Sequence, residues 1–367
     1  MIIYWSMFVI NAFFGYISHK THLNIFINNF KENRSRKFVA LIPMLYIVFW
    51  TGMRSGFVDT YAYIKTFENI PTGGISSVMS YMGDVEKDQL FYLLSALFKN
   101  YISTNYHWWL LLIAAISGLC IYRILNKYSD NYHFSIFLFL SMAIFIWMMN
   151  GIRQFLAVSV LFGFSDWLIE NKRFKYILLI VVMAFIHNSC IFLLPVCFFV
   201  NEDPWSKKIF FIILTVILLV IFSEQSTSLF VSTIGSDYAD TFSESDGSSL
   251  IRTFIAAIPT ILAFWKRKKI KIRNNPYINL CVNMSVFCAC FYLFASFTNG
   301  ILVGRFPMYF NVYNLILLPW ILRYCFNKDE RLLIYVVCII CYLFYFYYQA
   351  KIAGNYYYIS DFTGLIR

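Results

Sequence analysis

The chain has 367 residues, of which 60% are hydrophobic and only 13% are charged, and its mean hydropathy is +0.64. Because roughly a quarter of the residues in a soluble domain are charged, this composition excludes an ordinary soluble protein and indicates an integral membrane protein. The net charge of +11 would also suit nucleic-acid binding, but the placement of the basic residues favours an orientation signal. We therefore expect no nucleic-acid partner.

Eleven apolar runs approach the length of about 20 residues that a helix needs to cross the hydrocarbon. The first run lacks a basic segment before it and a small-residue cleavage site after it, so we interpret it as a membrane helix and not as a signal peptide. A shorter run at 190–200 would either cross or re-enter. The pattern predicts an all-α polytopic protein, with one integral membrane domain over residues 1–367. The runs are 1–18, 38–55, 106–125, 132–149, 153–170, 174–189, 208–223, 250–266, 277–298, 306–323 and 332–350.

The basic residues concentrate in alternate connections between these runs. Those connections hold 21 of the 30 lysines and arginines, so the positive-inside rule assigns them to the cytoplasmic side. This alternation requires the run at 190–200 to cross, which gives about twelve spans and places both termini outside. We interpret the run at 266–273 as an anchor on the membrane surface. The assigned connections are 19–37, 123–131, 171–175, 201–208, 266–273 and 323–331.

The predicted topology leaves two long loops on the outer side, at 56–105 and 224–249. Within the first loop, residues 89–100 have the pattern of an amphipathic helix that lies on the membrane. The second loop is rich in Ser, Asp, Glu and Gly, which is typical of a polar surface loop. We predict no soluble domain.

Three arginines on the predicted outer side begin or end a span: Arg54, Arg153 and Arg305. The arginine side chain offers a planar fork that binds phosphate in a bidentate manner and stays charged at any relevant pH. Three such forks on one face suggest a site for a diphosphate at the depth of the lipid headgroups. The alternative for each arginine is snorkelling from a helix end to lipid phosphates.

Two groups on the outer side could accept the proton of a sugar hydroxyl, Asp59 and His187. The unperturbed pKa of histidine, about 6.5, suits a base at neutral pH, whereas Arg54 near Asp59 would keep that carboxylate weakly basic. We favour His187 as the base and Asp59 as a residue that orients the substrate or an arginine. The structural alternatives are a satisfied core histidine for the first, and a salt bridge to Arg54 or a helix N-cap for the second.

Three further acids in the first outer loop, Asp84, Glu86 and Asp88, could bind a divalent cation, although a solvated acidic turn is the simpler interpretation. The sequence has no nucleotide-binding loop, no dinucleotide glycine pattern and no HExxH motif. Neither ATP-driven transport nor zinc-dependent hydrolysis is therefore supported. We expect no metal and no cofactor.

Four short motifs follow one another along the chain. They are Arg54-x-Gly-x-x-Asp59-x-x-x-Tyr63, Asn-Gly-Ile-Arg153-Gln154-x-x-Ala, Phe-x-His187-x-Ser and Gly-Arg305-x-x-x-Tyr309-Phe. In this order, and with this topology, they resemble the EpsG family of membrane polysaccharide polymerases, which are relatives of the Wzy-type O-antigen polymerases. One departure is Asp88, at a position where that family more often has a glutamate before an aromatic pair.

The resemblance implies an activity and a set of partners. Such proteins join oligosaccharide repeat units into O-antigen, capsule or exopolysaccharide at the periplasmic face of the bacterial cytoplasmic (inner) membrane. The donor is a growing glycan on undecaprenyl diphosphate, and the acceptor is a single lipid-linked repeat unit. The resemblance also implies a GT-C-like membrane glycosyltransferase architecture within the lipid bilayer and a chain-length regulator as a partner. Because the lipid diphosphate is already activated, no cofactor is required.

The resemblance and the residue chemistry together assign roles along the chain. Two alternatives stay open. An O-antigen ligase would transfer the glycan to the lipid A core, and a flippase would need a cavity that is reachable from both sides. The motif arginines lie on one predicted side, which favours a transferase. We expect catalytic roles for His187, Asp59 and Arg153, and substrate-binding roles for Arg54, Tyr63, Gln154, Arg305 and Tyr309.

Overall fold

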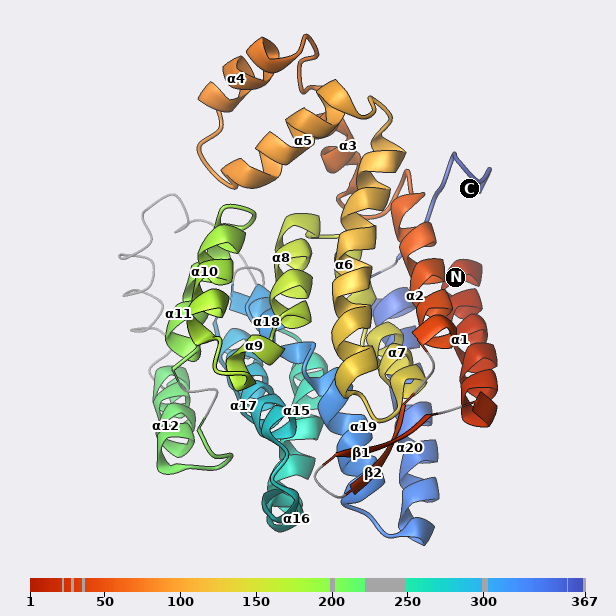
Figure 1. Cartoon of the computed structure of the whole chain (residues 1–367), viewed down its shortest axis with the longest axis vertical. Coiled ribbons are helices and arrows are strands. Elements are labelled where there is room, and N and C mark those ends of the chain that lie inside the picture. The colour runs from red at the N-terminus through yellow and green to blue at the C-terminus, as the bar shows by residue number, and fades with distance from the viewer. Residues whose placement is uncertain are drawn as a thin grey trace. The chain divides into compact units, whose positions relative to one another are not determined.

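The computed structural model consists mainly of helices (Figure 1). It describes residues 1–21, 37–198, 202–221, 248–298, 303–354 and 356–365, and the backbone of two strands at 23–27 and 30–34. The chain divides into two compact units, which we describe separately. Unit 1 is Met1–Leu194 with Lys328–Arg367, and unit 2 is Pro195–Asn327.

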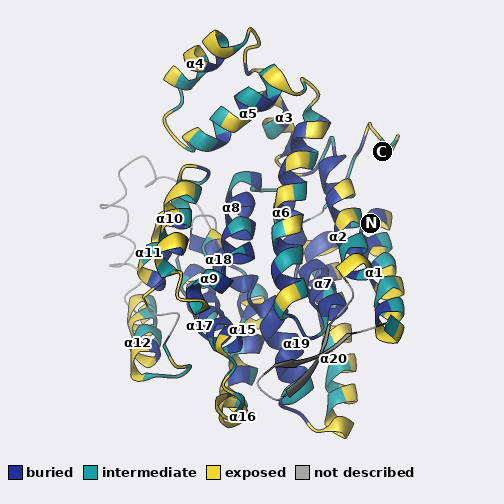
Figure 2. Ribbon diagram, viewed as in Figure 1, coloured by how far each residue is buried: buried dark blue, intermediate teal, exposed yellow. Residues whose placement is uncertain are grey.

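Five helical segments of the described chain are long and apolar enough to cross a membrane. Figure 2 shows that α12 (Lys207–Ile221) and α20 (Lys328–Tyr347) are largely exposed, although their outward side chains are mostly apolar. Exposed apolar faces on such helices are expected where lipid replaces water as the solvent. The prediction of a helical membrane protein is confirmed. The five segments are Ile2–Thr21, Tyr106–Tyr128, Ile152–Ile169, Pro276–Ser296 and Lys328–Ala353.

Unit 1 contains most of the helices and the only strand pair of the described residues. In this antiparallel strand pair, Ile27 pairs with Phe30. The strand pair departs from the all-α prediction. The elements are α1 (Ile2–Thr21), β1 (Leu23–Ile27), β2 (Phe30–Arg34), α2 (Lys37–Gly52), α3 (Thr60–Glu68), α4 (Ile75–Gly83), α5 (Gln89–Tyr101), α6 (Tyr106–Tyr128), α7 (Tyr132–Ser141), η1 (Ile144–Met148), α8 (Ile152–Gly163), α9 (Asp166–Ile169), α10 (Arg173–Ala184), η2 (Asn188–Phe192), α20 (Lys328–Tyr347) and η5 (Tyr348–Ala353).

Helix α6 forms the centre of unit 1 because small residues allow it to approach both of its neighbours. A Cβ added to Gly118 of α6 would lie 2.4 Å from Cγ2 of Val48 in α2. A Cβ added to Gly163 of α8 would lie 2.8 Å from Cβ of Cys120 in α6. Glycine at such positions lets the backbones of membrane helices approach closely. The three helices therefore form a tightly packed layer that positions the ends of α6 and α8.

The two ends of this layer carry different parts of the chain. Helices α6 and α8 run in the same direction, since Arg123 near the end of α6 contacts Asp166 beyond the end of α8, while Trp109 and Arg153 near their starts line one pocket. Helices α3, α4 and α5 lie beyond the end where α6 begins (Figure 1). Unit 1 thus has the connections 123–131 and 171–175 at one end and the loop 56–105 at the other, while the side of the membrane that each end faces stays a prediction.

Unit 2 is organised around α17, which is buried along most of its length (Figure 2). Polar pairs join this helix to α15: Oγ1 of Thr260 lies 2.7 Å from Oγ of Ser285, and Oγ1 of Thr253 lies 2.7 Å from Oγ of Ser296. Such hydrogen bonds between helices stabilise packing where water is absent. The elements are α12 (Lys207–Ile221), α15 (Leu250–Trp265), α16 (Arg267–Arg273), α17 (Pro276–Ser296), η4 (Val303–Arg305), α18 (Met308–Asn311) and α19 (Asn314–Tyr324), and α11 (Leu193–Val196) lies at the boundary of the units.

Several predicted spans are interrupted in the structure. The run at 132–149 ends as an α-helix at Ser141 and continues as η1 after Ala143, which has a left-handed φ of 58°. The run at 306–323 is divided between α18 and α19. Within 190–200 the described helical residues are 190–196, which cover about 12 Å of the roughly 30 Å of hydrocarbon. They do not cross as a helix by themselves, so the twelve-span count stays a prediction.

The two predicted outer loops have different outcomes. The helix expected at 89–100 is confirmed as α5, and α3 and α4 precede it in the same loop. The loop 224–249 falls almost entirely outside the described residues, which resume at residue 248.

Candidate active site

The candidate active site lies in unit 1, at the end where α8 begins and α10 ends. Asp88 precedes α5 with a left-handed φ of 54°. Arg153 lies in the first turn of α8, directly after Gly151, whose φ of 74° turns the chain into the helix. His187 follows α10 in an extended conformation, before η2. Three separate connections therefore place an acid, an arginine and a histidine at one end of the unit.

Asp88 is the centre of this cluster. Its Oδ2 lies 2.7 Å from Nη1 of Arg153 and 3.5 Å from Nδ1 of His187, and its Oδ1 accepts a hydrogen bond of 3.1 Å from the amide of Asn188. The contact to His187 is within ion-pair reach but longer than a good hydrogen bond. The Asp88 side chain is 7% exposed, whereas those of Arg153 and His187 are 32% and 25% exposed. The carboxylate is thus covered, and its two partners stay accessible.

The electrostatics of the cluster keep Asp88 ionised. Partial burial would raise the pKa of this carboxyl, but the His187 ring, the Arg153 guanidinium and the Asn188 amide outweigh burial and hold the pKa of Asp88 below its usual range. A permanently charged carboxylate can orient an imidazole ring and stabilise the imidazolium that forms when the ring takes a proton. The arrangement is therefore suited to proton transfer by His187.

Two tyrosines support Arg153 and the turn before it. The hydroxyl of Tyr92, in α5, accepts a hydrogen bond of 3.1 Å from Nη1 of Arg153, whose guanidinium carbon also lies 5.6 Å from the centre of the tyrosine ring. The hydroxyl of Tyr63, in α3, accepts a hydrogen bond of 2.9 Å from the amide of Gly151. Among the described residues, only the Nη1 atom of Arg153 is engaged. The other guanidinium nitrogens of Arg153, Nε and Nη2, are therefore available to bind an anion.

A pocket of about 140 Å³ adjoins Arg153. Its walls combine aromatic rings with hydroxyl groups: Phe67 stacks on Trp109 at 4.7 Å, and Nε1 of Trp109 donates to Oγ of Ser95. Aromatic faces with a few placed hydroxyls are typical of small-ligand pockets. The lining residues are Ala62, Tyr63, Thr66, Phe67, Ile70, Phe91, Tyr92, Ser95, Trp109 and Arg153.

Arg54 occupies a different environment from Arg153. Its side chain is 1% exposed, and its guanidinium donates to Oγ1 of Thr60 at 3.0 Å, to the carbonyl of Met149 at 3.2 Å and to the carbonyl of Thr51. Arg54 therefore ties together the end of α2, the start of α3 and the turn that enters α8. The structure does not bring it to the exposed part of the cluster.

The segment after Arg54 is held by the C-terminal part of the chain. The amides of Ser55 and Gly56 donate to the carbonyl of Ile359 at 2.9 and 3.1 Å. Asp361 in the same tail accepts a hydrogen bond of 2.9 Å from the hydroxyl of Tyr106, at the start of α6. These contacts fix the first motif against the end of α6 that the candidate site adjoins.

Asp59 is exposed and precedes α3 at the N-cap position, but its side chain makes no capping hydrogen bond. Within the described part of the chain it forms no ion pair with Arg54, so the salt bridge considered from the sequence is absent. Gln154 is 4% exposed and lies on the inner side of α8. Neither residue is part of the Asp88 cluster.

Arg305 and Tyr309 belong to unit 2, where Arg305 is exposed at the end of η4 and Tyr309 is buried in α18. The described residues contain no group of three or more His, Cys, Asp and Glu side chains that could hold a metal ion.

The sequence singled out Arg153 and His187 as candidates but not Asp88, the residue that contacts both. The sequence alone favours a solvated acidic turn at Asp88, although this aspartate directly precedes the amphipathic helix α5. The available signal was positional: Asp88 stands where the resembling family more often has a glutamate. An acid at a family motif position deserved more weight than the charge of the surrounding loop.

The helices, and the polar cluster at one end of unit 1, define a membrane protein with a candidate site for proton transfer and anion binding. The family model described as the EpsG family matches residues 37–362, which is nearly the whole chain. The chain belongs to the EpsG family, a Wzy-like polymerase family, which supports a membrane polysaccharide polymerase type of function. Neither a curated protein nor a solved structure matches the chain.

Proposed function

We propose that the protein is a glycosyltransferase that joins oligosaccharide repeat units carried on undecaprenyl diphosphate into O-antigen, capsule or exopolysaccharide. The observation that supports the proposal is the cluster of Asp88, Arg153 and His187, which brings a carboxylate, a partly exposed guanidinium and a partly exposed imidazole together. Membership of the EpsG family supports the reaction class. The reaction takes place at the periplasmic face of the bacterial cytoplasmic membrane. The apolar lipid carrier reaches the site by lateral diffusion within the membrane.

Arg153 binds the diphosphate of the donor. Only one terminal nitrogen of its guanidinium contacts Asp88 and Tyr92, and a third of the side chain is exposed. Negative charge on the diphosphate grows as the bond to the sugar breaks, so a fixed cation stabilises the transition state more than the ground state. Because Asp88 and Tyr92 hold the guanidinium before substrate arrives, little reorganisation accompanies the reaction.

His187 acts as the general base, and Asp88 orients it. The acceptor hydroxyl oxygen forms a bond to the anomeric carbon of the donor while the bond from that carbon to the diphosphate oxygen breaks. The hydroxyl proton moves to His187, and the electron pair of the broken bond leaves with the diphosphate. Asp88 stabilises the imidazolium that results. Asp59 is the alternative base.

The aromatic pocket beside Arg153 binds one sugar ring near the reacting bond. Tyr63 and Tyr92 supply hydroxyls, and Trp109 contributes an apolar ring surface. The C–H faces of a sugar pack on aromatic rings, and its hydroxyls exchange hydrogen bonds with such groups. A volume of about 140 Å³ suits a single ring, and further rings of the repeat unit extend outside.

The remaining sequence candidates have supporting roles in this proposal. Arg54 positions the turn that carries Arg153, and Gln154 packs behind it. Arg305 and Tyr309 are proposed substrate-binding residues of unit 2. The chain crosses the membrane about twelve times in a GT-C-like architecture, and a chain-length regulator is its partner.

Labelling in intact cells tests the orientation. Lys65→Cys should react with an impermeant maleimide, and Lys268→Cys should not.

The function is tested by deleting the gene and examining the glycans that remain. The proposal predicts that polymer disappears while single repeat units still reach their final acceptor. Loss of every glycan from the lipid A core would instead indicate a ligase. Lipid-linked repeat units trapped on the cytoplasmic face would indicate a flippase.

Complementation with Arg153→Lys then tests the role of the fork. Lysine keeps the charge but loses the bidentate geometry, so polymer formation should fall by about 100-fold, comparable to the loss of one transition-state donor. Lys65→Gln, an exposed variant in α3 at the same end of unit 1, should behave like the wild type. A fully active Arg153→Lys variant, inserted at normal levels, would contradict the assignment of this arginine.

A further inference from the structure

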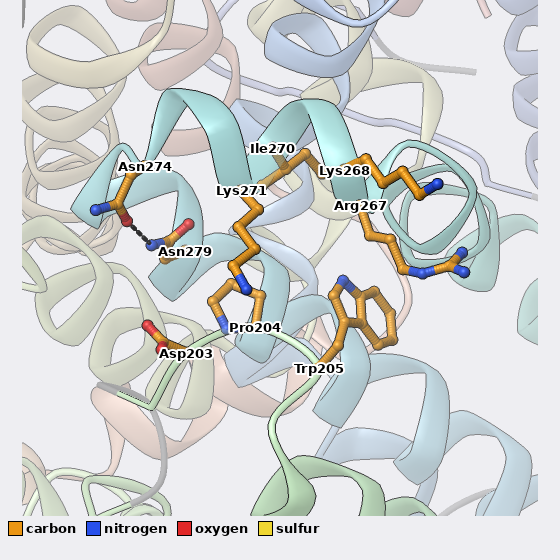
Figure 3. Close-up of a pocket in the computed structure, with 9 residues that line it drawn as sticks. All are labelled: Asp203, Pro204, Trp205, Arg267, Lys268, Ile270, Lys271, Asn274 and Asn279. Carbon is orange, nitrogen blue, oxygen red and sulfur yellow. Dashed lines mark hydrogen bonds between the residues drawn. The ribbon is translucent and has the colours of Figure 1, made fainter.

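Unit 2 contains a second pocket, of about 460 Å³, that the polymerisation reaction does not use. It lies between residues 203–205, before α12, and the basic helix α16 (Figure 3). The sequence assigns both segments to the cytoplasmic side, opposite to the proposed reaction. The pocket is therefore a separate site in chemistry and in predicted location.

The basic residues of the run at 266–273 do not all face this pocket. Lys266 lies 4.0 Å from the ring centre of Trp265, and Lys269 donates to the carbonyl of Cys325 at 3.0 Å. Lys268 and Lys271 line the pocket, and within the described part of the chain neither has an ion pair or a hydrogen bond from its ammonium group. Figure 3 shows Lys271 extending from α16 towards residues 203–205. The pocket thus presents two ammonium groups that form no ion pair with a described residue, although Asp203 also lines it.

Two buried polar atoms in the wall also lack partners among the described residues. They are Nε1 of Trp205, a donor, and Oδ1 of Asn279, an acceptor. The amide nitrogen of Asn279 is engaged, since it donates to Oδ1 of Asn274 at 3.1 Å. Buried polar atoms without a partner are uncommon because each costs stability. One donor and one acceptor in different parts of the lining indicate a ligand that carries both kinds of group.

We propose that this pocket binds a phosphate group that carries a neighbouring hydroxyl. Lys268, Lys271 and the indole N–H of Trp205 bind the phosphate oxygens, and Oδ1 of Asn279 accepts the hydroxyl. Asp203, an exposed acid that also lines the pocket, accepts a second hydroxyl and disfavours ligands that carry only negative charge. The headgroup of an anionic phospholipid such as phosphatidylglycerol has this chemistry, and so has free glycerol phosphate.

Binding is measured by calorimetric titration of the purified full-length chain in a neutral detergent. The probes are short-chain phosphatidylglycerol, short-chain phosphatidylcholine, whose headgroup has no hydroxyl, and glycerol phosphate. Phosphatidylglycerol should bind saturably and about tenfold more tightly than phosphatidylcholine, which corresponds to one good charge-assisted hydrogen bond. Glycerol phosphate distinguishes the sources: equal affinity indicates a soluble ligand, and weaker binding indicates the lipid.

Three variants connect the binding to the pocket. Lys271→Gln and Trp205→Phe should each weaken the binding of phosphatidylglycerol by about tenfold, because each removes one donor. The phenyl ring of the second variant keeps the edge contact that Trp205 makes with Phe264. Lys207→Gln, an exposed lysine outside the pocket, should bind like the wild type. Equal losses in all three variants, or no saturable binding of either glycerol-bearing probe, would overturn the proposal.

Discussion

The two ends of unit 1 each pair an arginine with a covered aspartate, yet the two pairs differ in what they leave open. At one end, Asp166 is 1% exposed and receives two nitrogens of Arg123, at 3.1 and 2.8 Å, and the ammonium of Lys127 at 2.6 Å. Glu170 extends the network to Lys172. At the other end, Asp88 contacts a single nitrogen of Arg153 and lies at a longer distance from His187.

The difference separates a structural ion cluster from a candidate catalytic one. In the first cluster, the cations and carboxylates satisfy one another, and the network joins the ends of α6, α8 and α9. In the second, Arg153 and His187 keep accessible atoms that no described residue engages fully. A buried charge pair contributes little net stability by itself, but removing one partner leaves an uncompensated charge. The closed cluster should therefore be sensitive in stability, and the open cluster in activity.

The largest effect is expected from Asp88→Asn. Loss of the carboxylate removes the group that orients His187 and holds Arg153, so turnover should fall by about 1,000-fold, within the range for a disrupted general base. Turnover is measured in proteoliposomes with lipid-linked repeat units. Asp84→Asn, an exposed residue of the same loop, is the matched control and should keep wild-type activity.

The same variant has a defined effect on the pH dependence of stability. Because the pKa of Asp88 is lowered in the folded protein, its ion pairs contribute stability above the unfolded pKa of about 4, and this contribution is lost as the pH falls through the lower folded value. Wild type and Asp88→Asn should thus differ in unfolding free energy at neutral pH and converge in strong acid. A difference in unfolding free energy that is the same at every pH would contradict the ion pairs of Asp88 with Arg153 and His187.

The second effect concerns the closed cluster. Asp166→Asn leaves Arg123 and Lys127 without their shared carboxylate, which should lower the free energy of unfolding by about 1 to 2 kcal/mol, because both cations are partly exposed to solvent. The measurement is unfolding of the purified protein in detergent, followed by tryptophan fluorescence. The activity of each correctly folded molecule should be unchanged, and Asp329→Asn, an exposed acid, should have no effect. A folded but inactive Asp166→Asn variant would contradict the assignment of a structural role to the Asp166 cluster and a catalytic role to the Asp88 cluster.

The smallest effect is expected from Asp59→Asn. This side chain is exposed, makes no capping hydrogen bond and forms no ion pair with Arg54 in the described structure. Surface substitutions of this kind usually change stability by about 0.5 kcal/mol or less, and turnover should stay within about threefold of the wild type if His187 is the base. A loss as large as that of Asp88→Asn would transfer the role of base to Asp59.

The local features of the fold could be predicted from the sequence. The amphipathic helical pattern of residues 89–100 indicated α5, and the long apolar runs indicated the long helices. The break after Ser141 could not be predicted in this way. It depends on the left-handed conformation of Ala143, which hydropathy does not record because both sides of the break are apolar.

The candidate site shows the same boundary between local and long-range information. Arg153 and His187 were identified because each lies in a short polar motif within apolar sequence. Arg54 looked equivalent to Arg153, since both flank a span, but only the fold shows that three contacts bury it. Asp88 was missed because its partners are 65 and about 100 residues away along the chain, beyond the reach of any local pattern.

The central claim is that His187, oriented by Asp88, is the base of the polymerisation reaction. The most direct test is the pH–rate profile of the wild type and of His187→Gln in proteoliposomes. We expect the wild-type rate to fall as the pH is lowered, because a protonated base cannot accept the hydroxyl proton. Asp88 cannot cause this fall, because the pKa of its carboxyl is lowered. The variant should be slower by about 100-fold or more and should lose the acid limb. A variant with near-wild-type turnover and the same acid limb would contradict the claim.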